Sequence, residues 1–197
     1  MNKIEKVIKN LKKRNMEGFC VKSGEEAVEK VLSLIDDKEK QIGFGWSTTN
    51  FEIGLIDKLR EKKYNLLDRF DSSLDRNSLI DILDKTQQCE ILITGTNAIT
   101  EDGKLVNSDG MGTRIAPMIY GPECVIVIVG KNKITKDVNT AFERIKEIAA
   151  PKNAKRKSLD LNNQRVMTKL MSYWAIIEFQ YREERIKVII IDKEHGF

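Results

Sequence analysis

The sequence predicts an α/β fold, in which helices cover an open, mostly parallel sheet. Two observations predict this class. Short apolar runs alternate along the chain with segments whose apolar residues recur at helical spacing, and this order is typical of a helix-covered sheet. The clearest apolar run, 125–129, holds five consecutive β-branched residues without polar alternation, which indicates a strand buried on both faces.

Length and composition suit one globular domain. A chain of 197 residues with 41% apolar residues can bury a core without a disulfide or a metal ion. The 34 basic and 30 acidic side chains leave a net charge of only +4, whereas a nucleic-acid binder usually shows a concentrated basic excess. We therefore expect a single domain over residues 1–197 and no nucleic-acid partner, while homo-oligomerisation stays open.

The cysteines and the apolar segments bear on location and metal binding. Cys20, Cys89 and Cys124 are far apart and form no C-x-x-C pair, which argues against a cysteine-bound metal and suits a reducing compartment. Residues 1–14 have no continuous apolar stretch of the signal-peptide type, and the apolar runs are too short to span a bilayer. We expect a cytoplasmic protein without membrane contact, metal or cofactor.

The first half of the chain is predicted to contain four helices and two strands. Apolar spacing indicates an amphipathic helix over about 2–15, and the pair Ser23 and Glu26 forms a capping box for a second helix. A strand over 41–44 follows. A second capping box, Thr49 with Glu52, opens the third helix, and after a strand at 64–67 Asn77 is expected to cap the fourth.

The second half begins with a strand over 90–93 and a hairpin turn at 102–103, whose return strand is 104–107. A short helix over 114–120 and the buried strand 125–129 come next. A helix over 137–149 is expected to end at Pro151, and 152–163 is a polar, basic excursion. The segments 174–181 and 185–192 are predicted to form a C-terminal β-hairpin, over about 174–192, that completes the same domain.

Glycines and hydroxyls follow the first predicted parallel strand. Gly43 and Gly45 would let the backbone approach a ligand closely, and the hydroxyls of Ser47 and Thr48 stand at the start of a helix, where anions bind. The alternative is purely local, since a glycine can end a strand and a hydroxyl can cap a helix without any ligand.

Two further loops lie at the ends of predicted strands. Gly95, Thr96 and Asn97 follow the strand 90–93, at the edge where ligands bind in open α/β sheets. The next loop, 107–114, contributes a further set of candidate ligand-binding residues: Asn107, Asp109 and Arg114. Arginine suits bidentate recognition of a carboxylate or phosphate. The local alternatives are an asparagine that satisfies its own turn and a structural Arg–Asp pair.

A fourth loop follows the strand 125–129, and its Lys133 could complement an anion, although a solvated loop explains it equally well. The catalytic residue is unknown from the sequence. Asp109 could be a general base, and Glu52 could be the carboxylate nucleophile that a CoA transferase needs, although capping also explains Glu52. His195, the only histidine, receives no role, and no cluster of His, Cys and carboxylates has metal-site spacing.

The ordered series of loops resembles a known family. Residues 43–54 read GFGWSTTNFEIG, residues 93–114 read ITGTNAITEDGKLVNSDGMGTR, and residues 121–134 read GPECVIVIVGKNKI. With Arg144-Ile145 and the stretch APKNAKR at 150–156, this series resembles the lactate-utilisation protein C-like family of LUD-domain proteins, from the first helix to about Arg156.

The resemblance implies a fold like that of ribose-5-phosphate isomerases, glucosamine-6-phosphate deaminases and CoA transferases (NagB/RpiA/CoA transferase-like). It also implies a role in lactate oxidation beside iron–sulfur oxidoreductase subunits. Two departures limit what is carried over. Residues 157–174, where many members carry cysteines, contain none, and the usual Gly-Asn-Arg is Gly112-Thr113-Arg114 here.

Three functions follow from these observations. The first, which we favour, is a lactate-utilisation-type protein that binds a small anionic ligand and supports lactate oxidation with iron–sulfur partners. The second is a stand-alone enzyme with isomerase-like or CoA-transferase-like chemistry on a phosphorylated or acyl-CoA substrate. The loop 94–97 has no carboxylate for proton transfer, which counts against isomerisation. The third is a non-catalytic interaction module. Whether the chain is an enzyme stays undecided at this stage.

Overall fold

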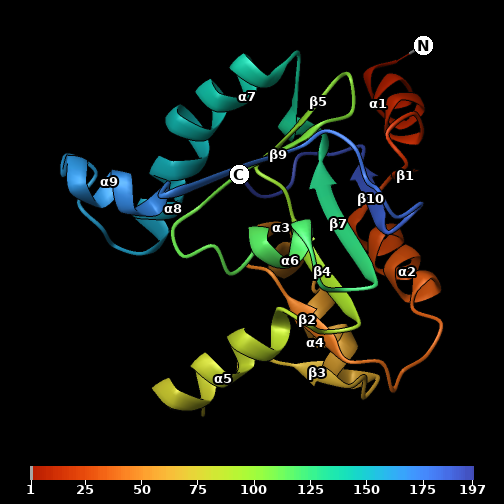
Figure 1. The fold of residues 1–197 in the computed structure, drawn as a ribbon, viewed down its shortest axis with the longest axis vertical. Helices are drawn as coiled ribbons and strands as arrows, with labels where there is room; N and C mark the ends of the chain where they lie inside the picture. Colours follow the sequence, from red (N-terminus) through yellow and green to blue (C-terminus); the bar gives the residue numbers. More distant parts are fainter. Residues whose placement is uncertain (1) are drawn as a thin grey trace.

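The computed structural model describes residues 2–197 and contains a six-stranded parallel sheet (Figure 1). Its strands, in spatial order, are β1 (Glu17–Val21), β10 (Ile186–Ile191), β7 (Cys124–Gly130), β4 (Ile91–Gly95), β2 (Ile42–Phe44) and β3 (Leu66–Leu67). All five neighbouring pairs run parallel. The predicted open, mostly parallel sheet is therefore confirmed, and its carboxyl ends lie at one edge.

Helices from the first half of the chain cover one face of this sheet. They are α2 (Gly24–Leu34), the short α3 (Thr48–Glu52) and α4 (Leu55–Glu61). Ala27 and Val31 of α2 and Leu55 and Leu59 of α4 are completely buried in one apolar cluster against the sheet. Helix α5 (Arg76–Thr86) packs beside β2 and β3.

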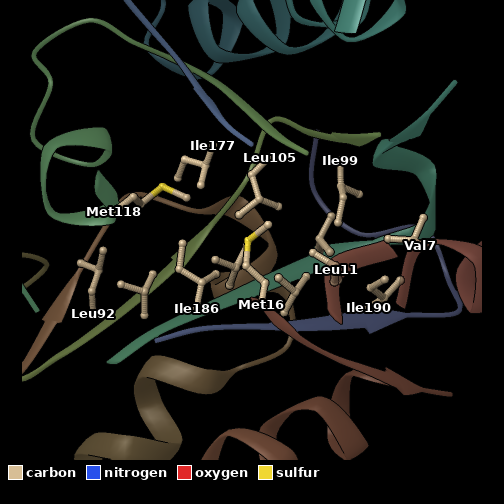
Figure 2. Packing of buried hydrophobic residues seen from close by; sticks show 14 of the residues in the cluster. Val7, Leu11, Met16, Leu92, Ile99, Leu105, Met118, Ile177, Ile186 and Ile190 are labelled. Atoms are coloured by element: carbon tan, nitrogen blue, oxygen red, sulfur yellow. The ribbon is translucent and has the colours of Figure 1, made fainter. Parts of the chain in front are cut away.

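A second sheet covers the opposite face. Its strands, in order, are β8 (Ile134–Thr135), β5 (Ala98–Thr100), β6 (Leu105–Asp109) and β9 (Tyr173–Ile177). Strands β5 and β6 form the predicted hairpin, with the turn at Gly103 in the left-handed region. Figure 2 shows side chains of this sheet, of α1 (Lys3–Lys12), of α6 (Ile115–Ile119) and of the parallel sheet meeting in one buried cluster.

Strand β7 shows why its sequence predicted burial on both faces. Its side chains alternate between the two clusters, with Ile126 and Ile128 on one face and Val125, Val127 and Val129 on the other. All five are completely buried. Burying such a side chain contributes about 1.5–3 kcal/mol, so this strand is a main source of the apolar stabilisation.

The prediction that Pro151 ends a helix is wrong. Helix α7 (Val138–Arg144) continues through a π-helical segment, Ile145–Ala149, into α8 (Ala150–Arg156), and Pro151 lies in the first turn of α8. Proline has no N–H to donate to the preceding turn, so it is tolerated in the first turn of a helix. The π turn before it is wider than an α turn, and the backbone there accommodates the missing hydrogen bond. The predicted excursion over 152–163 is therefore helical as far as Arg156, and a further helix that was not predicted, α9 (Gln164–Leu170), follows it.

The predicted C-terminal hairpin is also wrong, although both of its strands exist. Strand β9 pairs antiparallel with β6 in the second sheet, whereas β10 lies in the parallel sheet between β1 and β7. Strand β1, at the edge beside β10, was not predicted. Strands that are adjacent in sequence usually pair, but here the apolar run 186–191 is buried between two parallel neighbours.

Two predicted helix caps are placed differently. Ser47, not Thr49, caps α3 through the Asn50 N–H, and Asp75, not Asn77, caps α5 through the Ser78 N–H. Glu52 is the last residue of α3 and therefore takes no part in a capping box. The sequence offered several capping residues in a row, and the local spacing did not choose among them. Within residues 2–197, no helix has the length and apolar character needed to cross a membrane.

Candidate functional site

A crevice opens where the chain leaves β2 and β4 in opposite directions. After β2 the chain enters α3 and α4 on one face of the parallel sheet, and after β4 it enters the second sheet on the other face. Ligands of open α/β proteins bind at such a point, beyond the carboxyl ends of the strands. The close approach of the two strand ends requires Gly95, because a Cβ there would lie 3.1 Å from Ser47 Cβ.

A pocket of about 730 Å³ occupies this crevice. Eight predicted site residues line it: Ser47, Thr48, Gly95, Thr96, Asn97, Asp109, Arg114 and Lys133. Three others, Gly43, Gly45 and Asn107, lie behind it and are buried. The structure thus gathers residues from four separate loops around one cavity, as the positions at strand ends predicted.

Arg114 holds the inner wall of the pocket together. Its Nη1 donates to Asn107 Oδ1 at 2.6 Å and to the Gly95 carbonyl at 3.3 Å. Its Nη2 donates to Asn97 Oδ1 and to the Ser108 carbonyl, both at 2.7 Å. The four hydrogens on these two nitrogens are therefore matched by four protein oxygens. Burial lowers the pKa of this guanidinium, and the nearby Asp109 opposes that shift.

The same network fixes the neighbouring loops. Asn107 Oδ1 also accepts from the Asn97 N–H at 3.1 Å and from Thr96 Oγ1 at 3.2 Å, and Asn97 Oδ1 accepts from the Ser108 N–H at 2.9 Å. The Asp109 carboxylate accepts the backbone N–H groups of Met111, Gly112 and Arg114. These contacts connect β4 to β6, so the inner wall has a fixed shape before any ligand binds.

Glycines behind the pocket make room for this network. A Cβ at Gly45 would lie 2.8 Å from Arg114 Cγ, and a Cβ at Gly43 would lie 2.8 Å from Cγ2 of Thr86 in α5. Both distances are shorter than side chains tolerate, so the two glycines allow packing against Arg114 and α5. Their predicted contact with a ligand stays a prediction.

Lys133 lies at the base of the pocket and is only 3% exposed. It ends the 3₁₀ turn η1 (Lys131–Lys133) that follows β7, and its Nζ donates to Thr49 Oγ1 at 3.1 Å. Burial lowers the pKa of Lys133 to about 7, and repulsion by the Arg144 and Arg114 guanidinium groups adds to the shift, while Glu52 opposes it. This amine is therefore partly uncharged near neutral pH.

Ser108 adds an unpaired polar atom to the same wall. The residue lines the pocket and is 7% exposed, and its Oγ has no hydrogen-bond partner within residues 2–197. Buried hydroxyls are nearly always paired, because an unpaired one costs about 1–3 kcal/mol. The described residues therefore leave one buried hydroxyl unsatisfied beside the pocket.

Four basic residues of the pocket were not among the predicted site residues: Arg69, Arg156, Lys157 and Lys169. Arg69 follows β3 and is half-buried, and burial lowers its pKa against the attraction of Asp109. Arg156 lies over the Trp46 ring, with its guanidinium carbon 4.0 Å from the ring centre. The basic character of 152–163 was the only sequence signal for Arg156 and Lys157.

The outer part of the pocket is apolar. Ile145, Ala149 and Ala150 come from the π turn and α8, and Val166 and Leu170 come from α9. In Figure 1, α8 and α9 lie together at the left of the view, away from α1 and α2. The cavity therefore has a polar, cationic base, and its outer wall combines these apolar side chains with the cations Arg156, Lys157 and Lys169.

Glu52 lies outside the lining of the pocket. Its Oε2 accepts the Gly196 N–H at 2.7 Å and lies 3.3 Å from His195 Nδ1. These contacts, with that between Thr49 Oγ1 and the His195 carbonyl, hold the segment 195–197 against α3. Within residues 2–197, no group of three or more His, Cys, Asp or Glu side chains is placed to hold a metal ion.

Comparisons with known proteins place the chain in a family. The model of the LUD domain matches residues 4–196, so the chain belongs to the LUD-domain family. No protein of curated function matches it. A DUF162-family protein from Deinococcus radiodurans has a similar structure, with a TM-score of 0.55 and 13% identity over 97% of this chain and 99% of that one.

Two isomerase structures are similar to a lesser degree. Ribose 5-phosphate isomerase A from Neisseria gonorrhoeae has a TM-score of 0.44 at 12% identity, over 88% of this chain and 94% of that one. A D-ribose-5-phosphate isomerase in complex with phospho-erythronic acid has a TM-score of 0.37 at 18% identity, over 57% and 53%. The likeness to the DUF162-family protein concerns the fold alone.

Proposed function

We propose that this LUD-domain protein binds a small anionic ligand in the pocket and supports lactate oxidation beside iron–sulfur partner subunits. The observation that carries the proposal is the charge of the lining. Six basic side chains face the pocket, whereas Asp109 is the only acidic residue among those that line it. A concave site with one sign of charge and low-dielectric walls concentrates ligands of the opposite sign.

The available hydrogen-bond donors indicate where the anion would bind. The two Nη atoms of Arg114 already donate to protein oxygens, whereas Lys133 has one acceptor and Ser108 Oγ has none within residues 2–197. We place the anionic group near Lys133 and Ser108, with Arg69 at the rim. Arg114 then acts as a positioning residue for Asn97 and the neighbouring loops.

The contacts of the carboxylates weigh against the two enzyme alternatives. Sugar-phosphate isomerisation needs a carboxylate free to move a proton, but Asp109 accepts three backbone N–H groups. A CoA transferase needs a glutamate nucleophile in the substrate pocket, and Glu52 lies outside the lining. The unpaired Ser108 Oγ beside the pocket in turn weighs against a purely structural role.

The iron–sulfur partners are proposed from family membership alone. Residues 157–174 contain no cysteine, so in this proposal the ligands of any cluster come from the partner subunits. The division of labour is then that this chain binds the organic anion while its partners carry electrons.

Isothermal titration of the purified protein with lactate, pyruvate and inorganic phosphate tests the anion site. We expect Arg69→Gln to weaken binding about tenfold, since a charge-assisted hydrogen bond contributes about 1.5–3 kcal/mol. Arg76→Gln is the matched control, because Arg76 is exposed on α5 and lies outside the pocket. Absence of heat with every anion, or equal losses in the two variants, would contradict the proposal.

A further inference from the structure

Lys133 is buried beside a cavity, which is the environment of reactive lysines rather than of solvated ones. It lines the pocket from its base, is 3% exposed and makes one side-chain hydrogen bond, to Thr49 Oγ1. The neighbouring Lys131, two residues earlier on the same turn, is exposed and pairs with Asp192. Of these two amines, only that of Lys133 faces a cavity that could hold a substrate.

The charges around Lys133 favour its uncharged form. The guanidinium of Arg144 on α7 and that of Arg114 before α6 repel a second cation, and burial adds the larger effect. The opposing charge is that of Glu52 on α3, whose carboxylate also contacts His195. With a pKa of about 7 in place of 10.5, about half of the amines are free at pH 7, against roughly one in three thousand ordinary lysines.

We propose that Lys133 Nζ is a nucleophile that condenses with the carbonyl carbon of a small carbonyl compound bearing a carboxylate or a phosphate. This inference rests on the proposed anion site and names the substrate class of that site. The lone pair of the amine attacks the carbonyl carbon and gives a carbinolamine. The two amine hydrogens then leave with the carbonyl oxygen as water, and a C=N double bond remains. No oxidant or reductant is consumed.

The remaining lining explains why the carbonyl compound should be anionic. A neutral imine at Lys133 carries no positive charge. The cations at the rim, Arg69 and Lys157, keep theirs. An anionic group on the substrate offsets them. The apolar side chains of Ile145 and Leu170 also line the pocket and could contact the carbon chain of the bound compound.

Trapping with borohydride tests the proposal, because it reduces an imine to a stable secondary amine. The purified protein is incubated with pyruvate or with glyceraldehyde 3-phosphate, each beside its uncharged counterpart, methyl pyruvate or glyceraldehyde. Cleavage after glutamate releases residues 124–143 as one peptide, and fragmentation by mass spectrometry distinguishes Lys131, Lys133 and Lys136 within it. Lys133→Arg and Lys131→Arg are the paired variants.

We expect at least about tenfold more adduct on Lys133 than on Lys131, because Lys133 faces the pocket and is about half uncharged at pH 7, whereas Lys131 lies outside the pocket. The charged compound should also label Lys133 at least about tenfold more than its uncharged counterpart, because the basic lining attracts an anion. The Lys131→Arg variant should keep this adduct, and Lys133→Arg should lose it. Labelling by pyruvate alone identifies a carboxylate, and labelling by the phosphorylated aldehyde alone identifies a phosphate. The site is assigned in the unsubstituted protein, so the test stands even if Lys133→Arg does not fold.

Equal labelling of Lys131 and Lys133 would overturn the proposal, and so would equal labelling of Lys133 by the charged and uncharged members of a pair. Titration of the same compounds separates this failure from failure of the anion site. Binding without an adduct on Lys133 refutes the nucleophile and leaves the proposed function intact. Absence of both binding and adduct refutes both.

Discussion

The two walls of the pocket differ in how they are built. The inner wall, residues 47–48, 95–97 and 108–114, lies on strand ends and is tied together by the buried guanidinium of Arg114. The outer wall, residues 145–170, consists of the π turn, α8, a loop and α9, and α9 buries no residue. The comparison shows that the inner wall fixes the geometry, whereas both walls supply cations: Arg114 in the inner wall and Arg156, Lys157 and Lys169 in the outer one.

Replacing a cation in each wall tests this division, and the inner one should have the largest effect. We expect Arg114→Met to lower the free energy of unfolding by about 3 kcal/mol or more, because it removes the four hydrogen bonds that the two Nη atoms of the buried guanidinium make. Arg156→Met in the outer wall should cost less than about 1 kcal/mol, the usual worth of an exposed cation–π contact. Urea denaturation measures both, and equal losses would break the comparison.

The pH dependence of stability extends the comparison to Lys133, at the base of the pocket. The pKa of Lys133 is about 7 in the fold against 10.5 when it is exposed, so between these values the unfolded state binds more protons. Stability should therefore rise with pH in this window, by up to about 1.4 kcal/mol per pH unit, relative to Lys133→Met. Denaturation of both proteins at pH 7, 8.5 and 10 measures the slope, and parallel profiles would contradict it.

The smallest effect is expected at the outermost cation. Lys169→Ala should weaken phosphate binding by about threefold at low salt and hardly at all at high salt, because exposed charges are screened. Unfolding free energy should stay within about 0.5 kcal/mol of the unsubstituted protein. Lys152→Ala is the matched control, since Lys152 is exposed on α8 and outside the lining. Titration at two salt concentrations measures the difference, and a loss that persists at high salt would place Lys169 in direct contact with the anion.

Local patterns predicted most elements but not their partners. The apolar run 125–129 and the capping box at Ser23 and Glu26 are strong local signals, and the turn at Asp102-Gly103 specifies its own hairpin. The segments 174–181 and 185–192 were given the right state and the wrong neighbours. Pairing of β10 with β1 and β7 depends on burial far along the chain, which no local window contains.

The sequence predicted which loops meet at the site, because these loops follow parallel strands. It did not predict the contacts that their side chains make across the fold. Loops at the ends of parallel strands share one edge, which is why Ser47, Asn97 and Lys133 were named together. That the donors of Arg114 are engaged, and that Arg69 reaches the pocket from β3, follows only from tertiary contacts. Residues 157–170 carried too little apolar periodicity to predict a wall.

The pairing of β1 with β10 has a consequence for the order of events during synthesis. Glu17 of β1 pairs with Lys187 of β10, and their side chains form an ion pair at 2.8 Å, 170 positions apart in sequence. A nascent chain emerging from the ribosome therefore holds β1 without its strand partner until the segment 186–191 is translated. A stalled ribosome carrying residues before 186 would expose this edge to chaperones and to aggregation.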